Sequence, residues 1–208
     1  MDRHIAPINR FDADDVERIE DQLLYSGFFG LEKRRLRHRQ FNGEWSETID
    51  REVHVRRDAV GVLLYDPACD KVVLVEQIRA GALDDDVSPW KLEPVAGLVE
   101  PGETPAEVAR REAQEEAGCD IAELIELHRY YPSPGACTEQ VTLFCGLIDS
   151  AGVGGVHGVE DEHEDILVHV MSFPEAWDRL MAGQLDNAMA LIGFHWLARE
   201  RATLRAKV

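Results

Sequence analysis

The chain has 208 residues, a formal net charge of −18 and a sequence pI of about 4.7. So acidic a chain, with no compensating basic stripe, argues against nucleic acid as a partner. Hydrophobic residues make up 45% of it, enough for a substantial core in one large domain or a core domain with a small addition. We see no signal peptide or membrane-length apolar stretch, and the four cysteines form no C-x-x-C pair. We therefore expect buried free thiols and a cytoplasmic protein without a membrane partner.

Residues 1–56 differ in character from the rest of the chain. Basic and apolar residues alternate over 35–41, and Asn42-Gly43 then gives a strong hairpin-turn signal. Residues 45–55 return as a second strand. A hairpin with a third short strand is too small to be stable alone. We therefore expect a small N-terminal antiparallel β domain that packs on the main domain or on another subunit.

Residues 57–208 form the second expected domain, in which strand and helix patterns alternate. Strands are predicted at 59–65, 72–78, 92–96, 121–131, 140–148 and 166–172, and helices at 105–117, 174–183 and 187–201. The segment 149–165 is rich in Gly and acidic residues, which predicts a long mobile loop. This arrangement favours an α/β fold of the α/β/α sandwich type.

The helix predicted at 105–117 has clear start and stop signals. Thr104-Pro105-Ala106-Glu107 has the form of a capping box with proline at the first helical position. Gly118 is a natural left-handed stop. The helix boundaries are therefore set by local sequence.

Three carboxylates share one face of this helix. Glu112, Glu115 and Glu116 are related by i, i+3 and i+4, and Arg111 lies one turn before Glu115, where it can hold that carboxylate. A Glu-rich helix alone is more often a solvated acidic face, but the cap, the preceding Gly-rich loop and the arginine favour a metal site. Repulsion between Glu112 and Glu116 indicates a cation between them. Hard oxygen ligands with no Cys or His nearby favour Mg²⁺ or Mn²⁺ over Zn²⁺.

The segment from Gly97 to Cys119 carries the spacing G-x5-E-x7-R-E-U-x-E-E-x-G-U, where U is apolar. It resembles the signature box of the Nudix hydrolases. The matching residues are Gly97, Glu103, Arg111, Glu112, Ala113, Glu115, Glu116, Gly118 and Cys119. Other stretches are similar to the ADP-ribose pyrophosphatases of bacteria within this family, including Tyr25–Phe29, Glu76–Arg79 and Ser133–Gly135. The resemblance implies the Nudix α/β/α sandwich with a mixed sheet.

The resemblance also implies an activity, which is the metal-dependent hydrolysis of ADP-ribose to AMP and ribose 5-phosphate by water attack on the diphosphate. Two to three Mg²⁺ or Mn²⁺ ions per site would be held by the Ala96 carbonyl, Glu112 and Glu116, with Glu115 in the same cluster. Glu162, in the Gly-rich loop, would activate the water. Arg111 and Glu115 complete the implied catalytic set.

Substrate contacts are implied as well. Phe28 would stack on adenine, with Arg51 and Glu52 near the base. Without the resemblance, Phe28 is as often a plain hydrophobic contact, and Arg51-Glu52 could be an exposed ion pair worth little. Arg79 would contact the diphosphate and Glu139 the terminal ribose. The two remaining implied contacts are Leu98 and Ser133.

Two alternative functions stay open at this point. One is another nucleoside-diphosphate-sugar pyrophosphatase, acting on GDP-mannose or ADP-glucose. The other is a non-catalytic Nudix regulator that senses ADP-ribose, although such proteins usually carry a DNA-binding extension and often a degraded box. The related pyrophosphatases are dimers whose N-terminal domains cross to the partner. The resemblance therefore implies a homodimer with exchanged 1–56 domains and an adenine site built from both subunits.

Overall fold

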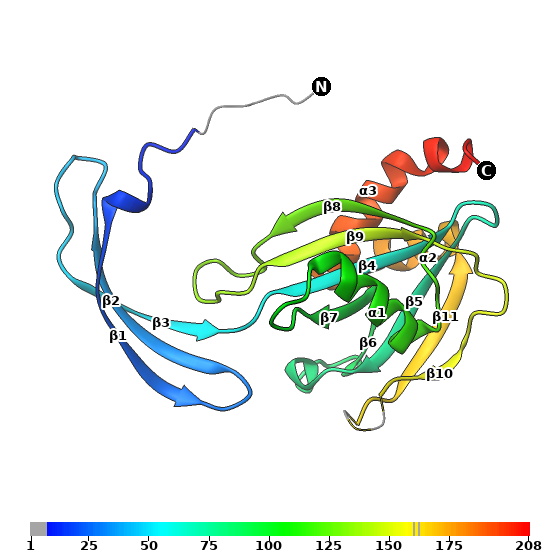
Figure 1. The fold of residues 1–208 in the computed structure, drawn as a ribbon, viewed down its shortest axis with the longest axis horizontal. Helices are drawn as coiled ribbons and strands as arrows, with labels where there is room; N and C mark the ends of the chain where they lie inside the picture. Colours follow the sequence, from blue (N-terminus) through cyan, green and yellow to red (C-terminus); the bar gives the residue numbers. More distant parts are fainter. Residues whose placement is uncertain (1–7, 160, 162) are drawn as a thin grey trace. The chain divides into compact units, whose positions relative to one another are not determined.

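The computed structural model describes residues 8–208 except 160 and 162 (Figure 1). The chain divides into two compact units, each described here by itself. The first unit comprises Met1–Arg56 and Ser133–Glu139, and the second comprises Arg57–Pro132 and Gln140–Val208. No helix in the described part of the chain is long and apolar enough to cross a membrane.

The first unit is built on a three-stranded antiparallel sheet with the order β1-β2-β3. A short 3₁₀ helix, η1 (Ala13–Asp15), precedes it. The strands are β1 (Val16–Ser26), β2 (Gly30–His38) and β3 (Ile49–Val55). The third strand expected beside the hairpin is thus the first along the chain, and at 11 residues it is not short.

The turn predicted at Asn42-Gly43 is confirmed, but the strand after it starts later than predicted. Gly43 has φ of 94°, and its N–H donates to the Gln40 carbonyl at 2.8 Å. Residue 45 forms only an isolated bridge, and β3 begins at Ile49. The Trp45 ring packs instead beneath two arginines of the preceding strand region, Arg37 and Arg39, at 4.9 and 4.5 Å.

The second unit contains an eight-stranded sheet and three α-helices. Its main strand order is β10-β11-β5-β4-β9-β8, with β6 paired to β5 and β7 to β4. The β4–β9 pair is parallel and the other pairs are antiparallel, so the sheet is mixed, as predicted. The strands are β4 (Ala59–Asp66), β5 (Lys71–Ile78), β6 (Trp90–Glu93), β7 (Val95–Leu98), β8 (Glu123–Tyr130), β9 (Val141–Leu147), β10 (Gly155–His157) and β11 (Ile166–Ser172). The helices are η2 (Ala80–Ala82), α1 (Pro105–Ala117), α2 (Phe173–Met181) and α3 (Ala188–Arg205).

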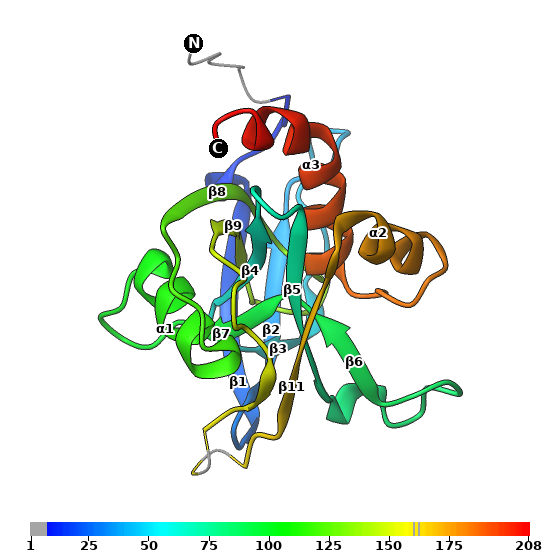
Figure 2. The ribbon, with the colours of Figure 1, turned by 90° about the vertical axis from the view of Figure 1, so that its right-hand side faces the viewer.

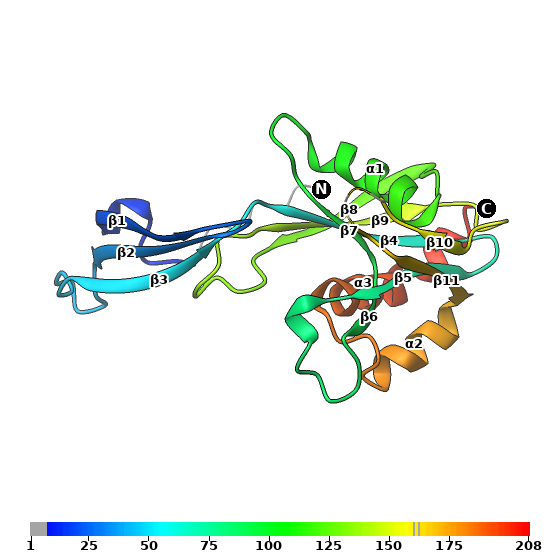
Figure 3. The ribbon, with the colours of Figure 1, turned by 90° about the horizontal axis from the view of Figure 1, so that it is seen from below.

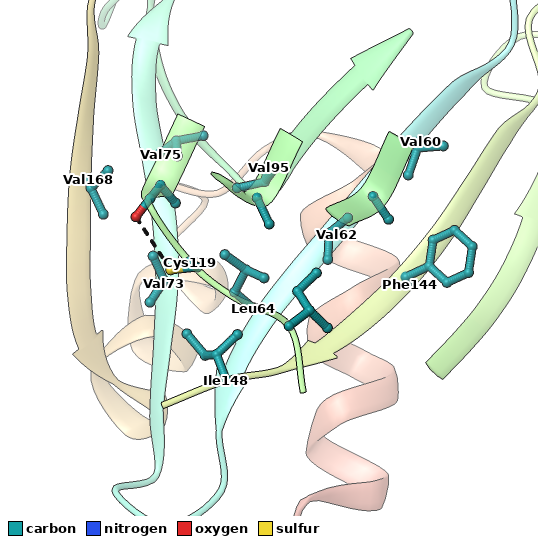
Figure 4. Packing of buried hydrophobic residues seen from close by; sticks show 14 of the residues in the cluster. Val60, Val62, Leu64, Val73, Val75, Val95, Cys119, Phe144, Ile148 and Val168 are labelled. Atoms are coloured by element: carbon teal, nitrogen blue, oxygen red, sulfur yellow. Dashed lines mark hydrogen bonds between the residues drawn. The ribbon is translucent and has the colours of Figure 1, made fainter. Parts of the chain in front are cut away.

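The helices cover both faces of this sheet, which confirms the predicted sandwich. Figures 2 and 3 show α1 on one face and α2 and α3 on the other. Side chains alternate along β4, so that Val62 and Leu64 join the cluster beneath α1 while Leu63 and Tyr65 join the cluster beneath α2 and α3. Figure 4 shows the first of these clusters. Both faces of β4 are therefore buried, as its unbroken apolar sequence requires.

Three further sequence predictions need correction. The single strand predicted at 92–96 is two strands, because Pro94 has no N–H for a sheet ladder and marks the change of partner from β5 to β4. The loop predicted at 149–165 contains β10, which pairs with β11. The thiols are all free, and Cys119 and Cys145 are buried, but Cys69 is exposed and Cys137 only half-buried.

Candidate active site

Helix α1 has the boundaries that its sequence predicts. The Glu107 N–H donates to the Thr104 side-chain oxygen at 3.3 Å, and the Thr104 N–H donates to the Glu107 carboxylate at 2.8 Å. Gly118 ends the helix with φ of 61°. Capping at both ends fixes the register that brings Glu112, Glu115 and Glu116 to the same side of the helix.

Glu116 is the most deeply placed carboxylate of the three, with only 2% of its surface exposed. Its Oε2 accepts the backbone N–H of Ala96 at 3.0 Å, and its Oε1 accepts the Gln77 Nε2 amide at 3.2 Å. Ala96 lies on β7, the short strand that pairs with β4. The helix and the sheet are thus joined through the carboxyl group of Glu116.

Glu112 approaches the backbone next to this contact. A Cβ added to Gly97 would overlap the Glu112 carboxylate. Only glycine leaves room for the side chain at that point. The first glycine of the box is therefore explained by the close approach of β7 to Glu112.

Arg111 joins three carboxylates. Its Nη1 donates to Glu112 Oε1 and to Glu115 Oε2, each at 2.8 Å, and its Nε donates to Glu103 Oε1 at 3.1 Å. The predicted contact between Arg111 and Glu115 is confirmed. The hydrogen bond to Glu103 is the largest of several interactions that raise the pKa of Arg111 further. Arg111 thus orients the acidic face of the helix.

Burial raises the pKa values of two of these carboxyl groups. The pKa of Glu112 rises to about 7, mainly through burial, and the charges of Glu115 and Glu164 add to the increase. The pKa of Glu116 rises to about 8, again mainly through burial, and the charge of Glu112 adds to it. Without a cation, the ionised forms of these two groups are therefore unfavourable.

These pKa values predict how the stability of the metal-free protein depends on pH. Both groups hold protons more tightly in the folded chain, so the free energy of unfolding falls as pH rises from about 5 to about 8. The melting temperature in EDTA should therefore drop across that range. Excess Mg²⁺ should reduce the drop, because an ion favours the ionised carboxylates. The double variant Glu112→Gln with Glu116→Gln should give a flatter profile in EDTA. A melting temperature that rises over this range would contradict the prediction.

The described residues contain no group of three or more Asp, Glu, His or Cys side chains converging as in a closed metal site. Glu112 faces Arg111, and Glu116 faces Gln77 and the Ala96 N–H. The donor atoms nevertheless fit a hard divalent cation, because they are carboxylate oxygens whose burial, together with the charges of neighbouring carboxylates, raises their pKa values. Such a cation would compete with Arg111 for Glu112.

The loop that follows β10 lies against the end of α1. The Gly158 N–H donates to the Glu115 carbonyl at 3.3 Å. The His157 ring lies over Gly118, and its Nε2 contacts the Gly154 carbonyl at 3.0 Å. Glu164, in the same loop, is close enough for its charge to act on Glu112. The predicted base, Glu162, lies outside the described residues.

Arg79 and Leu98 also belong to this side of the second unit. Leu98 ends β7 and pairs with Ala59. Arg79 follows β5, its Nε donates to Glu93 Oε2 at 2.6 Å, and its charge acts on Glu116. The structure thus brings Arg79 and Ala96 together with the Glu116 carboxylate, and Leu98 lies two residues beyond Ala96 on β7.

The other predicted substrate residues belong to the first unit. Phe28 is 76% exposed and meets Phe29 edge to face, with ring centroids 4.7 Å apart. Arg51 and Glu52 lie on β3, where the Arg51 Nη1 donates to the Asp50 carbonyl at 2.8 Å. No ion pair between them is seen in the described residues. Phe28 lies in the turn between β1 and β2, whereas β3 pairs Glu52 with Lys33 and Arg51 with Arg34 further along β2. No contact joins Phe28 to Arg51 or Glu52 in the described part of the chain. An exposed aromatic ring suits stacking on a flat base.

Ser133 and Glu139 lie at the two ends of the segment that joins the first unit. The Ser133 carbonyl accepts the Cys137 N–H at 2.9 Å, which closes a tight turn. Glu139 is buried and pairs with the Arg56 guanidinium at 3.2 Å.

Sequence reasoning missed Arg56 as a candidate. Its guanidinium lies 4.4 Å above the Phe29 ring, and its Nε is buried with no hydrogen-bond partner among the described residues. Buried polar atoms are normally paired, so this nitrogen is an unused donor among the described residues. The sequence shows only two adjacent arginines, Arg56 and Arg57, and does not distinguish between them. Glu164 and Gln77 were missed for the same reason, since only tertiary contacts single them out.

The acidic segment from Gly97 to Cys119, the mixed sheet and the helices on both of its faces agree with the Nudix fold that the sequence suggested. The sequence profile of the NUDIX domain matches residues 55–191, and the chain belongs to this family. The resemblance inferred from the signature box is thereby confirmed.

Curated relatives match over nearly their whole length. The "ADP-ribose pyrophosphatase" of Escherichia coli (strain K12) is 43% identical over 195 residues, which cover 94% of this chain and 93% of that protein. The "ADP-ribose pyrophosphatase" of Haemophilus influenzae is 40% identical over 206 residues, covering 98% and 95%. A crystal structure of an "ADP compounds hydrolase" matches the fold with a TM-score of 0.67 at 19% identity, covering 89% of this chain and 96% of that one.

Proposed function

We propose that this chain hydrolyses ADP-ribose to AMP and ribose 5-phosphate by attack of water on the diphosphate. The observation that carries the proposal is the intact acidic face of α1 against β7, in a chain 43% identical to an ADP-ribose pyrophosphatase over 93% of that protein. The free thiols suit a reducing compartment, and we place the enzyme in the cytoplasm.

The proposed enzyme depends on Mg²⁺ or Mn²⁺, with two to three ions in each site. The Ala96 carbonyl, Glu112 and Glu116 would hold them, with Glu115 and Glu164 at the edge of the cluster. When bound, the ions neutralise the diphosphate oxygens and acidify the attacking water. The raised pKa values of Glu112 and Glu116 support this role, because a cation would remove the cost of ionising both.

The chain's own residues would then position the reactants. Glu162, which follows β10 in the sequence, is the proposed general base. It would remove a proton from the attacking water. Arg79 would bind the diphosphate, since a guanidinium matches phosphate oxygens in pairs. Arg111 would keep Glu112 and Glu115 oriented, as its two 2.8 Å contacts support.

Residues of the first unit would bind the adenosine and ribose ends, and Leu98 is a further proposed substrate contact. Phe28 would stack on adenine, with Arg51 and Glu52 at the base edge. Glu139 would accept hydrogen bonds from the hydroxyls of the terminal ribose, and Ser133 is the remaining proposed contact. The buried pair of Glu139 with Arg56 supports a fixed position for that carboxylate.

A nucleotide-sugar panel tests the proposed reaction. ADP-ribose, GDP-mannose and ADP-glucose are compared by kcat/KM with Mg²⁺, and products are separated by chromatography. We expect ADP-ribose to be preferred at least about tenfold, a difference of about 1.4 kcal/mol, with AMP and ribose 5-phosphate as products. A preference for another nucleotide sugar would make that compound the substrate in place of ADP-ribose. Binding of ADP-ribose without turnover would indicate a sensor. Full activity in excess EDTA would refute the metal dependence.

We also propose a homodimer in which the first unit of each subunit completes the partner's adenine site. Support comes from the sheet β1-β2-β3, in which no residue is fully buried. Large apolar side chains are exposed on it, among them Leu23 at 60% and Tyr25 at 64%. A sheet of three strands without a buried face needs a covering surface. A second copy of the chain supplies one.

Mixed dimers test this arrangement. The Phe28→Ala variant and the Glu112→Gln variant should each be inactive or nearly so. In an exchanged dimer, one site of each mixed pair is intact, so an equal mixture should recover up to about a quarter of wild-type activity. Subunit exchange is checked by native mass spectrometry. A monomer at micromolar concentration, or exchange without recovery, would contradict the proposal.

A further inference from the structure

Gln77 is a buried polar side chain that contacts Glu116 but has no part in the proposed function. It lies on β5 with 7% of its surface exposed, and its Nε2 donates to Glu116 Oε1 at 3.2 Å. This is one of the two hydrogen bonds that hold the Glu116 carboxylate. The other comes from the Ala96 N–H at 3.0 Å.

The alternation of β5 explains how Gln77 reaches Glu116. Val73 and Val75 belong to the cluster beneath α1, so Gln77, two residues further along, faces the same side. Its neighbour Glu76 points to the other face and pairs with His169 at 2.7 Å. A one-residue change of register would therefore exchange an amide for a carboxylate beside Glu116.

The chemistry of an amide suits this position. An ionised carboxylate only accepts hydrogen bonds, so Gln77 must present its nitrogen to Glu116. With one oxygen held by Gln77 and the other by the Ala96 N–H, the carboxylate plane is fixed, while each oxygen keeps a lone pair for another partner. Removing the amide would leave one buried oxygen without this donor and the carboxylate free to turn.

We infer that Gln77 is a positioning residue that fixes Glu116 for the divalent cation. The inference rests on the proposed function, because it assumes that Glu116 is a metal ligand. Residues that hold a metal ligand in place typically contribute about 10-fold to 100-fold in metal affinity. The same effect is expected of Gln77.

Mn²⁺ binding measured by electron paramagnetic resonance tests the inference without relying on activity. Gln77→Met removes the donor and keeps a side chain of similar length. We expect its Mn²⁺ dissociation constant to be about 10-fold to 100-fold above that of the wild type. Gln114→Met is the control, since Gln114 lies on α1 and its amide donates to Asp120 instead, at 2.6 Å. That variant should bind Mn²⁺ like the wild type.

Activity provides a second readout. If Gln77 acts through metal affinity, saturating Mn²⁺ should restore most of the kcat of Gln77→Met, whereas a merely structural defect would persist. If that variant does not fold, Gln77→Asn carries the test, because its shorter amide no longer reaches Glu116. A folded variant whose Mn²⁺ affinity is within twofold of wild type would overturn the inference. Absence of Mn²⁺ binding by the wild type would instead overturn the proposed function.

Discussion

Replacing Glu112 by Gln is expected to lower the rate of ADP-ribose hydrolysis by about two to three orders of magnitude while the fold survives. The loss corresponds to several kcal/mol of charge stabilisation by a metal ion in the transition state. The fold should survive because the amide has the same shape, and Arg111 keeps its contacts with Glu103 and Glu115. Steady-state kinetics at saturating Mg²⁺, with a melting curve for each variant, provide the measurement.

Glu107→Gln is the matched control for this substitution. It makes the same chemical change on the same helix, at the end remote from the metal cluster. Glutamine can replace glutamate in the capping box that Glu107 forms with Thr104. Its rate should stay near wild type. If Glu112→Gln remains within threefold of the wild type, Glu112 is not a metal ligand that the reaction needs.

The second large effect is expected at Glu162. If this residue is the general base, Glu162→Gln should lose about 10²-fold to 10⁴-fold in kcat. Binding of Mn²⁺ and of ADP-ribose should change little, which calorimetry with the inactive variant can measure. The pH profile of the remaining activity should lose its acidic limb, because the amide does not titrate.

Asp161→Asn provides the control, because Asp161 is an exposed acid next to Glu162 in the same loop. It removes one charge from the loop without touching the proposed base. Equal losses in the two variants would mean that the activity depends on the negative charge of the loop and not on one residue that acts as the base. A near wild-type rate for Glu162→Gln would move the base to Glu115 in the signature box.

The sequence predicted most accurately the features that depend on interactions between residues close together along the chain. The limits of α1 were predicted correctly because the capping box and Gly118 act over a few residues. The sandwich followed from the order of buried strands and helices, and the mixed sheet followed from the resemblance to the Nudix family. The break at Pro94 was not predicted, since it depends on which neighbouring strand each half pairs with. The strand β10 was missed because a Gly-rich, acidic segment shows little strand pattern.

The same distinction holds for the site. The acidic face of α1 could be predicted because its members are close in sequence and share a helix. Arg56 and Gln77 could not, because their importance comes from contacts with residues far along the chain, Glu139 and Glu116. The tight approach at Gly97 also became clear only when Glu112 was seen against β7.

The first unit is assembled from two separate pieces of chain. The backbone carbonyl of His54 accepts the Thr138 N–H at 3.1 Å, and the His54 backbone N–H donates to the Ala136 carbonyl at 2.7 Å. A fragment that ends at Arg56 would lack this second piece, and a fragment that begins at Arg57 would carry it unpaired. Chimaeras that exchange the first unit between relatives must therefore transplant both pieces. In evolution, likewise, an insertion or deletion in the β8–β9 connection is constrained by residues some 80 positions away.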